Sequence, residues 1–183
     1  MKFIPTSFTG LTVIQGAPIN DHRGTFLRTY CKKEFLDFGL SREFVQSNLS
    51  INKIKGTIRG MHAQIKPNTE AKLIRCVYGR VFDVAVDLRI SSPTFLKYFS
   101  IELSAQDFNS IYIPEGFVHG FQVLEKNSIL IYNHTSFFNP SDEFGIRYDD
   151  PIINIQWPLV PSNISNKDLS YHLIEQNFQG LKI

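Results

Sequence analysis

The feature that most constrains the fold is a rhythm of short apolar stretches along most of the chain. β-Branched and aromatic residues alternate or cluster within each stretch, and Gly, Pro, Asn, Asp and Ser separate the stretches. Segments of this composition favour β-strands joined by tight turns. We therefore expect an all-β sandwich or barrel, with strands within residues 10–16, 24–30, 72–89, 97–104, 109–116, 120–126 and 128–138.

Only two segments have helical character. In residues 31–40, Phe35 and Phe38 are three apart, and Gly39 is a suitable residue to end a helix. Residues 166–177 form the second candidate, with Asn166 as the expected N-cap. A few short helices are thus expected to flank the β-structure.

Length and composition indicate one well-packed domain spanning residues 1–183. Hydrophobic residues make up 43% of the chain and aromatic residues 13%, which suits a core rich in rings. The 19 basic and 17 acidic residues leave a formal charge of only +2, too small a field to favour nucleic acid as a partner. Cys31 and Cys76 lack the spacing of a disulfide framework or zinc site and are expected to be small buried hydrophobic residues.

The first residues resemble neither a secretion signal nor a membrane span. Pro5 interrupts the apolar run near the start of the chain. A soluble, cytoplasmic protein without a membrane partner is expected.

His62 and Gln64 lie two apart and share one face of an expected strand, Glu70 follows, and His119 comes after a Pro-x-Gly turn. These two short motifs resemble those of the cupin superfamily, a family of small jelly-roll barrels. Metal-binding cupins carry histidines and a carboxylate at such positions, but here Gln64 stands where a second histidine is needed. The resemblance therefore supports the fold, and neither a metal nor another cofactor is expected.

A different chemistry suits the inward-facing polar residues. His62 is a candidate base, Lys72 supplies a positive charge at the start of an expected strand, and Tyr132 supplies a phenol. A base can remove a carbon-bound proton next to a carbonyl, a cation can stabilise the enolate, and a phenol can return a proton. This set of groups is typical of an epimerase acting beside a ketone.

Several longer motifs follow one another from about residue 10 to residue 168, among them "RGMHAQ", "KLIRCVYGRVFDVAVDLR", "IYIPEGFVHGFQVL" and "EFGIRYDDP". Together they resemble the dTDP-4-dehydrorhamnose 3,5-epimerase family of cupin-fold nucleotide-sugar epimerases. The resemblance implies a cupin-type jelly roll and a homodimer that exchanges N-terminal strands. It also implies epimerisation of a nucleotide-linked 4-keto-6-deoxy sugar at C3 and C5 without a cofactor.

The resemblance further implies roles for individual residues. His62 matches the general base, Asp168 its orienting carboxylate, Lys72 the cation near the keto oxygen, and Tyr132 the general acid on the opposite face. His119 matches a substrate contact, and Asp83 a carboxylate that holds Lys72 or His119 in place. The other positions that match substrate-binding residues are Arg23, Gln46, Asn48, Arg59, Glu143 and Lys167. No function is assigned to His22, His134 or His172.

Some positions depart from the family pattern. Ile19 replaces an expected aromatic residue, Arg28 stands where a glutamate is common, and Phe137 and Phe138 occupy the place of a tyrosine. These departures leave open a CDP- or GDP-linked sugar and an enzyme that acts at C3 or C5 alone. A metal-dependent cupin oxygenase and a sugar-binding cupin are the alternatives from other classes.

Overall fold

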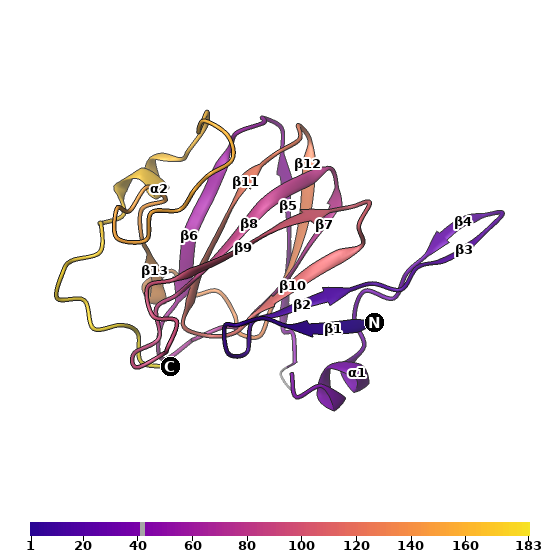
Figure 1. Cartoon of the computed structure of the whole chain (residues 1–183), viewed down its shortest axis with the longest axis horizontal. Helices are drawn as coiled ribbons and strands as arrows, with labels where there is room; N and C mark the ends of the chain where they lie inside the picture. Colours follow the sequence, from indigo (N-terminus) through magenta and orange to yellow (C-terminus); the bar gives the residue numbers. More distant parts are fainter. Residues whose placement is uncertain (41–42) are drawn as a thin grey trace.

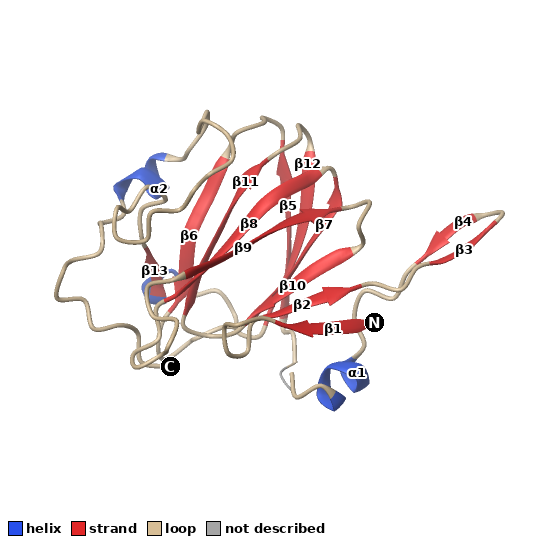
Figure 2. Cartoon of the chain, in the orientation of Figure 1, coloured by secondary structure: helices blue, strands red, loops and turns tan. Residues whose placement is uncertain are grey.

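The computed structural model describes residues 1–40 and 43–183, and its main body is two antiparallel sheets that face one another (Figures 1 and 2). The six-stranded sheet has the order β1 (Lys2–Pro5), β2 (Thr12–Gln15), β10 (Asn109–Ile113), β7 (Lys72–Tyr78), β12 (Ser128–His134) and β5 (Gln46–Asn52). The five-stranded sheet has the order β13 (Glu143–Gly145), β6 (Ile58–Gln64), β11 (Phe117–Val123), β8 (Arg80–Asp87) and β9 (Tyr98–Ser104). The chain crosses repeatedly between the sheets, and the predicted all-β jelly roll is confirmed.

The main core lies between the two sheets. Ile74, Ile111 and Leu130 reach it from the six-stranded sheet, while Leu103 and Phe121 reach it from the five-stranded sheet. Each is at most 2% exposed. Alternation along the strands directs these side chains inward, because successive residues of a strand point to opposite faces.

Strand β8 is buried on both faces. Val84 and Val86 pack in a second cluster with Met61 and Ile146, on the side of the five-stranded sheet away from the main core. Asp83, although charged, is also fully buried on this strand. A buried carboxylate is costly unless it is paired, so its partner is part of the site described below.

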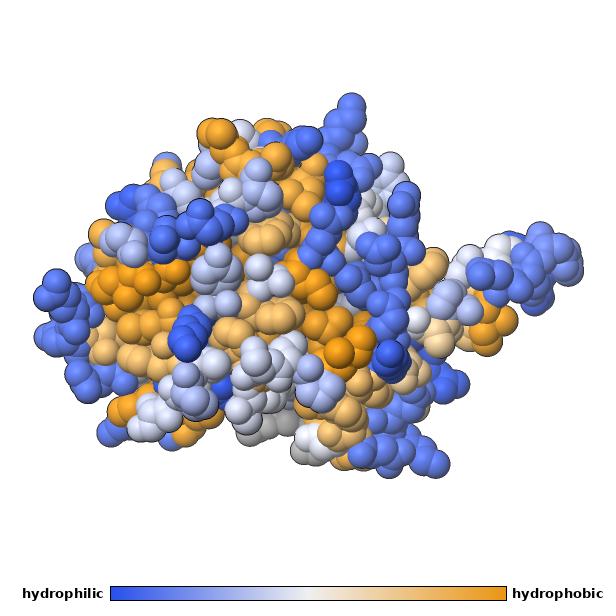
Figure 3. Space-filling model, in the orientation of Figure 1, coloured by the Kyte–Doolittle hydropathy of each residue, from blue (hydrophilic) through white to orange (hydrophobic). Residues whose placement is uncertain are grey.

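A two-stranded hairpin of β3 (Ile19–Asp21) and β4 (Gly24–Phe26) projects from the body of the molecule (Figure 1). Its side chains are exposed, including Ile19 and Phe26. In Figure 3 the tip of this hairpin is hydrophilic, and an apolar area lies along one side of it. The strand predicted within residues 24–30 is therefore short and ends at Phe26.

Both predicted helices are present, with one correction. Helix α1 (Lys32–Asp37) lies within the expected segment and buries Phe35 against the aromatic rings of Phe3, Tyr30 and Phe44. Beside it, Cys31 is only partly buried, unlike Cys76.

The predicted N-cap of the second helix was wrong. Helix α2 (Asn166–Ser170) begins after Ser165, whose Oγ accepts a hydrogen bond from the Asp168 N–H. Ser165 takes this role because it has the extended backbone of a cap, whereas Asn166 is already helical. The helix ends at Ser170 because Tyr171 is extended, and the only other helical turn is the 3-10 segment η1 (Pro140–Asp142) in the described ranges.

Within residues 1–40 and 43–183, no helix has both the length and the apolar character needed to cross a membrane.

Candidate active site

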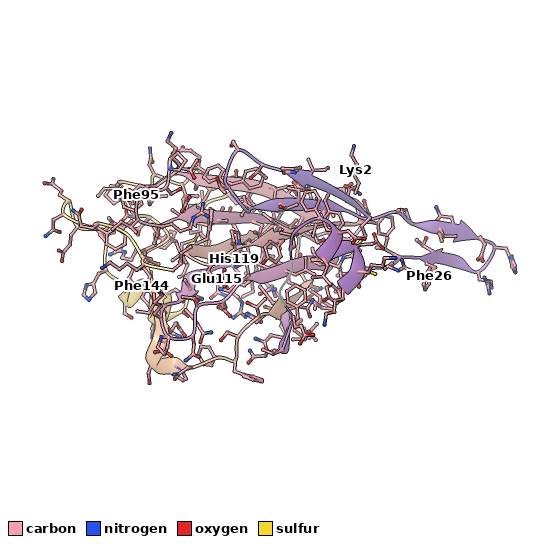
Figure 4. The ribbon with its side chains drawn as sticks, turned by 90° about the horizontal axis from the view of Figure 1, so that it is seen from below. Lys2, Phe26, Phe95, Glu115, His119 and Phe144 are labelled. Carbon is pink, nitrogen blue, oxygen red and sulfur yellow. The ribbon has the colours of Figure 1, made fainter. Side chains whose placement is uncertain are left out.

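A cavity of about 390 Å³ lies between the two sheets, and α2 forms part of its wall. The predicted site residues that line it are His62, Lys72, Tyr132, Asp168, Asn48, Arg59, His119 and Lys167. Figure 4 labels His119 near the middle of the molecule. The remaining wall is formed by Leu49, Ser50, Phe121, His134 and Ser165.

His62, on β6, is held by Asp168 of α2. The His62 Nε2 and Asp168 Oδ1 atoms are 2.7 Å apart, and Asp168 Oδ2 accepts a hydrogen bond from the Gly60 N–H. Burial alone raises the pKa of Asp168, but the hydrogen bond and charge of His62 and the Gly60 N–H hold it below the ordinary value. An ionised carboxylate can only accept a hydrogen bond, so the Nε2 atom of His62 carries a proton. In a neutral imidazole the other nitrogen, Nδ1, is then unprotonated and can act as the base.

His119, on β11, forms a second histidine–carboxylate pair with Asp83 of β8. Its Nε2 lies 2.8 Å from Asp83 Oδ2, and both side chains are buried. Burial lowers the pKa of His119, and the nearby carboxylate opposes that change only in part. Because His119 lies directly opposite His62 in the β6–β11 register, the two imidazoles share one face of the sheet. Asp83 was expected to hold Lys72 or His119, and in the structure it contacts His119.

Lys72 enters the cavity from β7, in the opposite sheet. Its Nζ donates to the backbone oxygen of His62 at 3.1 Å and forms an ion pair with Glu70 Oε1 at 3.1 Å. An ammonium group has three donors, so these contacts leave one donor for a ligand.

Tyr132 lies on β12, close to His119. The two ring centroids are 6.2 Å apart, and the planes meet at 68°. Burial raises the pKa of Tyr132, and the charge of Asp83 raises it further. The side chain is therefore a neutral phenol at physiological pH, able to donate a proton.

The cavity has a cationic rim. Arg59 is fixed by a hydrogen bond from its Nε to Asn52 Oδ1 at 2.8 Å. Lys167 pairs with Glu143 at 2.5 Å, and Glu143 also accepts from the Tyr171 hydroxyl. Two cations beside a polar cavity suit an anionic ligand such as a diphosphate.

Some predicted binding residues lie outside the cavity lining. Glu143 does not line the cavity, but it forms an ion pair with Lys167, which does. Gln46 accepts a hydrogen bond from the Phe138 N–H at 3.0 Å, so it holds the neighbouring loop. Arg23 is at the end of the projecting hairpin, paired with Asp21, and its side chain is 78% exposed. Within this chain, Arg23 is therefore not brought to the site.

Gln64 and Glu70, which lie at positions where other cupins bind a metal, make different contacts here. Gln64 donates to the Phe137 oxygen and accepts from the Asn139 N–H, while Glu70 pairs with Lys72. In the described parts of the chain, no group of three His, Cys, Asp or Glu side chains is arranged to hold a metal ion.

Sequence reasoning assigned no function to His134, yet this side chain lines the cavity. It follows Tyr132 by two residues on one strand, so both face the same side, and that spacing was a usable signal. Tyr171 was also missed; its ring centroid lies 5.5 Å from that of His62. It lies within residues 166–177, where a helix was expected, and no motif singled it out.

Comparison with known proteins decides the family. The model of the dTDP-4-dehydrorhamnose 3,5-epimerase family matches residues 5–176. The chain belongs to this family. The predicted resemblance is thus confirmed, and so is the enzyme class, an epimerase among the isomerases.

Individual members of the dTDP-4-dehydrorhamnose 3,5-epimerase family align over almost the whole chain. The enzyme of that name from Shigella flexneri is 41% identical over 171 residues, covering 93% of this chain and 94% of its own. A dTDP-6-deoxy-D-glucose-3,5-epimerase from Legionella pneumophila, solved with dTDP-4-keto-L-rhamnose, has a TM-score of 0.91 at 35% identity, covering 100% and 98%. A 3'-monoepimerase from Streptomyces bikiniensis, solved with dTDP-quinovose, has a TM-score of 0.87 at 27% identity, covering 93% and 86%.

Proposed function

We propose that this protein epimerises a dTDP-linked 4-keto-6-deoxy sugar at both C3 and C5. The observation that carries the proposal is the arrangement of one cavity, in which His62 and its carboxylate partner face Lys72 and Tyr132. The two sides come from different sheets: His62 is on β6, whereas Lys72 and Tyr132 are on β7 and β12. A sugar ring between the sheets would meet the base on one face and the phenol on the other.

The chemistry follows from these positions. The C4 ketone acidifies the protons on C3 and C5, and Nδ1 of His62 removes one of them as Asp168 stabilises the resulting imidazolium. The electron pair of the broken C–H bond becomes the enolate, whose oxygen is stabilised by the Lys72 ammonium. Tyr132 then protonates the carbon from the opposite face, which inverts its configuration. For the cycle to repeat at the second carbon, the His62 imidazolium must lose its proton to solvent, the Tyr132 phenolate must regain one from solvent, and the sugar ring must shift in the cavity.

The nucleotide end is assigned to the cationic rim. Arg59 and Lys167 would bind the diphosphate, with Asn48 and His119 as further polar contacts of the substrate. None of these steps uses a cofactor. The proposed location of this reaction is the cytoplasm.

The working unit is proposed to be a homodimer in which Arg23 serves the neighbour's site. The hairpin that carries Arg23 projects into solvent with Ile19 and Phe26 exposed. Strand β5 is an edge of its sheet and exposes Ile51 and Leu49, of which Leu49 lines the cavity. An uncovered apolar edge is a surface that a second copy could cover.

One alternative remains within the same chemistry, namely epimerisation at a single carbon. The likeness to the Streptomyces bikiniensis 3'-monoepimerase favours it. A CDP- or GDP-linked substrate is the other variation, and the exposed Ile19 and Arg28 are the departures that motivate it.

The deciding experiment is NMR of dTDP-4-keto-6-deoxyglucose incubated with the protein in deuterated water. Loss of both the C3 and C5 proton signals is expected. Loss of one signal would identify a single-site enzyme, and no exchange with dTDP, CDP or GDP sugars would contradict the proposal. Elemental analysis in parallel tests the oxygenase alternative, since stoichiometric iron or manganese would favour it.

A further inference from the structure

Glu70 lies behind the cavity and joins two of its walls. Its Oε1 pairs with Lys72 Nζ at 3.1 Å, and its Oε2 lies 2.7 Å from His134 Nδ1. All three side chains are largely buried, with 8%, 10% and 12% exposed for Glu70, Lys72 and His134. Lys72 and His134 line the cavity, whereas Glu70 does not.

The hydrogen bonds around His134 assign one protonation pattern. Burial raises the pKa of Glu70, but the hydrogen bond from His134 and the charge of Lys72 hold it below the ordinary value. The ionised carboxylate accepts a hydrogen bond from the Nδ1–H of His134, and His134 Nε2 lies 3.3 Å from Asn48 Nδ2, which can donate to it. Both ring nitrogens are thereby satisfied, and the ring stacks at 23° to Tyr132.

The pairing of the strands beside Glu70 does not depend on this carboxylate. The adjoining ends of β7 and β12 are already joined by the Ala71 N–H to Thr135 Oγ1 and by the Thr135 N–H to the Ala71 oxygen. Burying an ion pair brings little net stability, because desolvation offsets the attraction. A buried Glu70 between two cavity residues is therefore better explained by what it does to them.

We propose that Glu70, supported by His134, is a positioning residue that fixes the Lys72 ammonium where the enolate oxygen forms. This inference rests on the proposed function. A lysine side chain is long and flexible. Without Glu70, the hydrogen bond to the His62 backbone oxygen is the one that its ammonium group would keep among the described residues. The carboxylate thus directs the third N–H of Lys72 into the cavity, while His134 keeps Glu70 from turning away.

The test is to measure the exchange of the C3 and C5 sugar protons in the variant Glu70→Gln. This substitution keeps the size of the side chain and removes its charge. A fall in kcat of about 10- to 100-fold is expected, with KM changed less than about threefold, because the misplaced cation acts on charge that develops during reaction. The loss must be equal at C3 and C5, since both enolates share the C4 oxygen. His134→Gln keeps the ion pair between Lys72 and Glu70, so its kcat should fall less than that of Glu70→Gln.

The matched control is Glu102→Gln, which removes a carboxylate paired with Arg80 on the outer surface. Its kcat should equal that of the wild type. An unchanged kcat in Glu70→Gln, a change confined to KM, or a loss at one carbon alone would overturn the inference.

A second measurement does not depend on turnover. In ¹⁵N NMR, a well-held ammonium group exchanges its protons slowly enough to be seen, and the Lys72 signal is expected in the wild type and not in Glu70→Gln. A signal unchanged in the variant would overturn the inference. Wild-type protein that shows this signal but exchanges neither sugar proton would instead contradict the proposed function.

Discussion

His62 and Asp168 are 106 residues apart in the chain, yet their side chains meet at 2.7 Å in the cavity wall. The contact depends on α2, a helix of five residues whose first turn holds Asp168 against β6. The same carboxylate accepts from the Gly60 N–H, so its position is set from both sides. The orientation of His62 therefore depends on a short C-terminal segment.

Asp168→Asn should preserve the fold and lower kcat by about 100-fold or more. The amide can still approach His62, but it brings no negative charge to stabilise the imidazolium. Exchange at C3 and C5, measured by NMR in deuterated water, should fall together. Asp37→Asn, which alters an exposed carboxylate on α1, is the control and should keep wild-type kcat. Full activity in Asp168→Asn would exclude this carboxylate from the mechanism.

Much of this site follows from strand periodicity and motif, and the rest depends on distant pairing. Alternation along β12 is enough to place Tyr132 inward, and the same rule places His134 beside it. Glu70, by contrast, meets His134 across 64 residues of sequence. Local pattern carries no information on that register, because it is set by how β7 pairs with β12.

The start of α2 shows a local signal that was misjudged. Ser165 precedes Asp168 by three residues, the spacing of a capping box, and this favours Ser165 over Asn166 as the cap. Arg23 shows the opposite limit. Both strands of its hairpin are exposed, so the structure of this one chain does not connect the motif that suggested a binding role with the cavity.

Tyr132→Phe should separate proton removal from inversion. His62 can still form the enolate in this variant, but the phenol that protonates the opposite face is missing. Formation of inverted product should fall by about 100-fold, and exchange of solvent deuterium with retained configuration should fall less. The two rates are read from the same NMR sample by coupling constants. Equal loss of both rates would show that Tyr132 has no separate role in protonation.

Asp87 is expected to control stability and not catalysis. It is fully buried and accepts hydrogen bonds from Arg89, Ser92 and Thr94. Asp87→Asn should therefore lower the free energy of unfolding by about 3 kcal/mol, because Arg89 loses its buried charge partner. Urea unfolding at neutral pH measures this, and Asp149→Asn, on a surface pair with Arg147, should change it by less than about 1 kcal/mol.

The same carboxylate makes stability depend on pH. Burial raises the pKa of Asp87, but its hydrogen bonds, led by Arg89, hold it below the ordinary value. A group with a depressed folded-state pKa stabilises the fold fully above its unfolded pKa of about 3.9, and this contribution is lost as pH falls through the folded pKa. The difference between wild type and Asp87→Asn should thus shrink below about pH 4. A difference that grows on acidification would contradict this assignment.

Complementation between two inactive variants tests whether Arg23 acts on the neighbouring subunit. Arg23→Ala removes the cation from the exposed hairpin, and His62→Ala removes the base from the cavity. If the site combines His62 of one subunit with the partner subunit's Arg23, a mixed dimer has one complete site and one that lacks both groups. Each variant alone should be nearly inactive in proton exchange, with His62→Ala still binding dTDP.

Co-expression of the two variants should then restore exchange, up to about half of the wild-type activity per mixed dimer, as one of two sites is complete. Co-expression of His62→Ala with Asp168→Asn is the matched control. In that mixed dimer one site lacks the base and the other lacks its carboxylate, because both groups belong to the same chain. No restoration is therefore expected in the control. Activity of the Arg23→Ala mixture no higher than the sum of its parents would place Arg23 outside the partner's site.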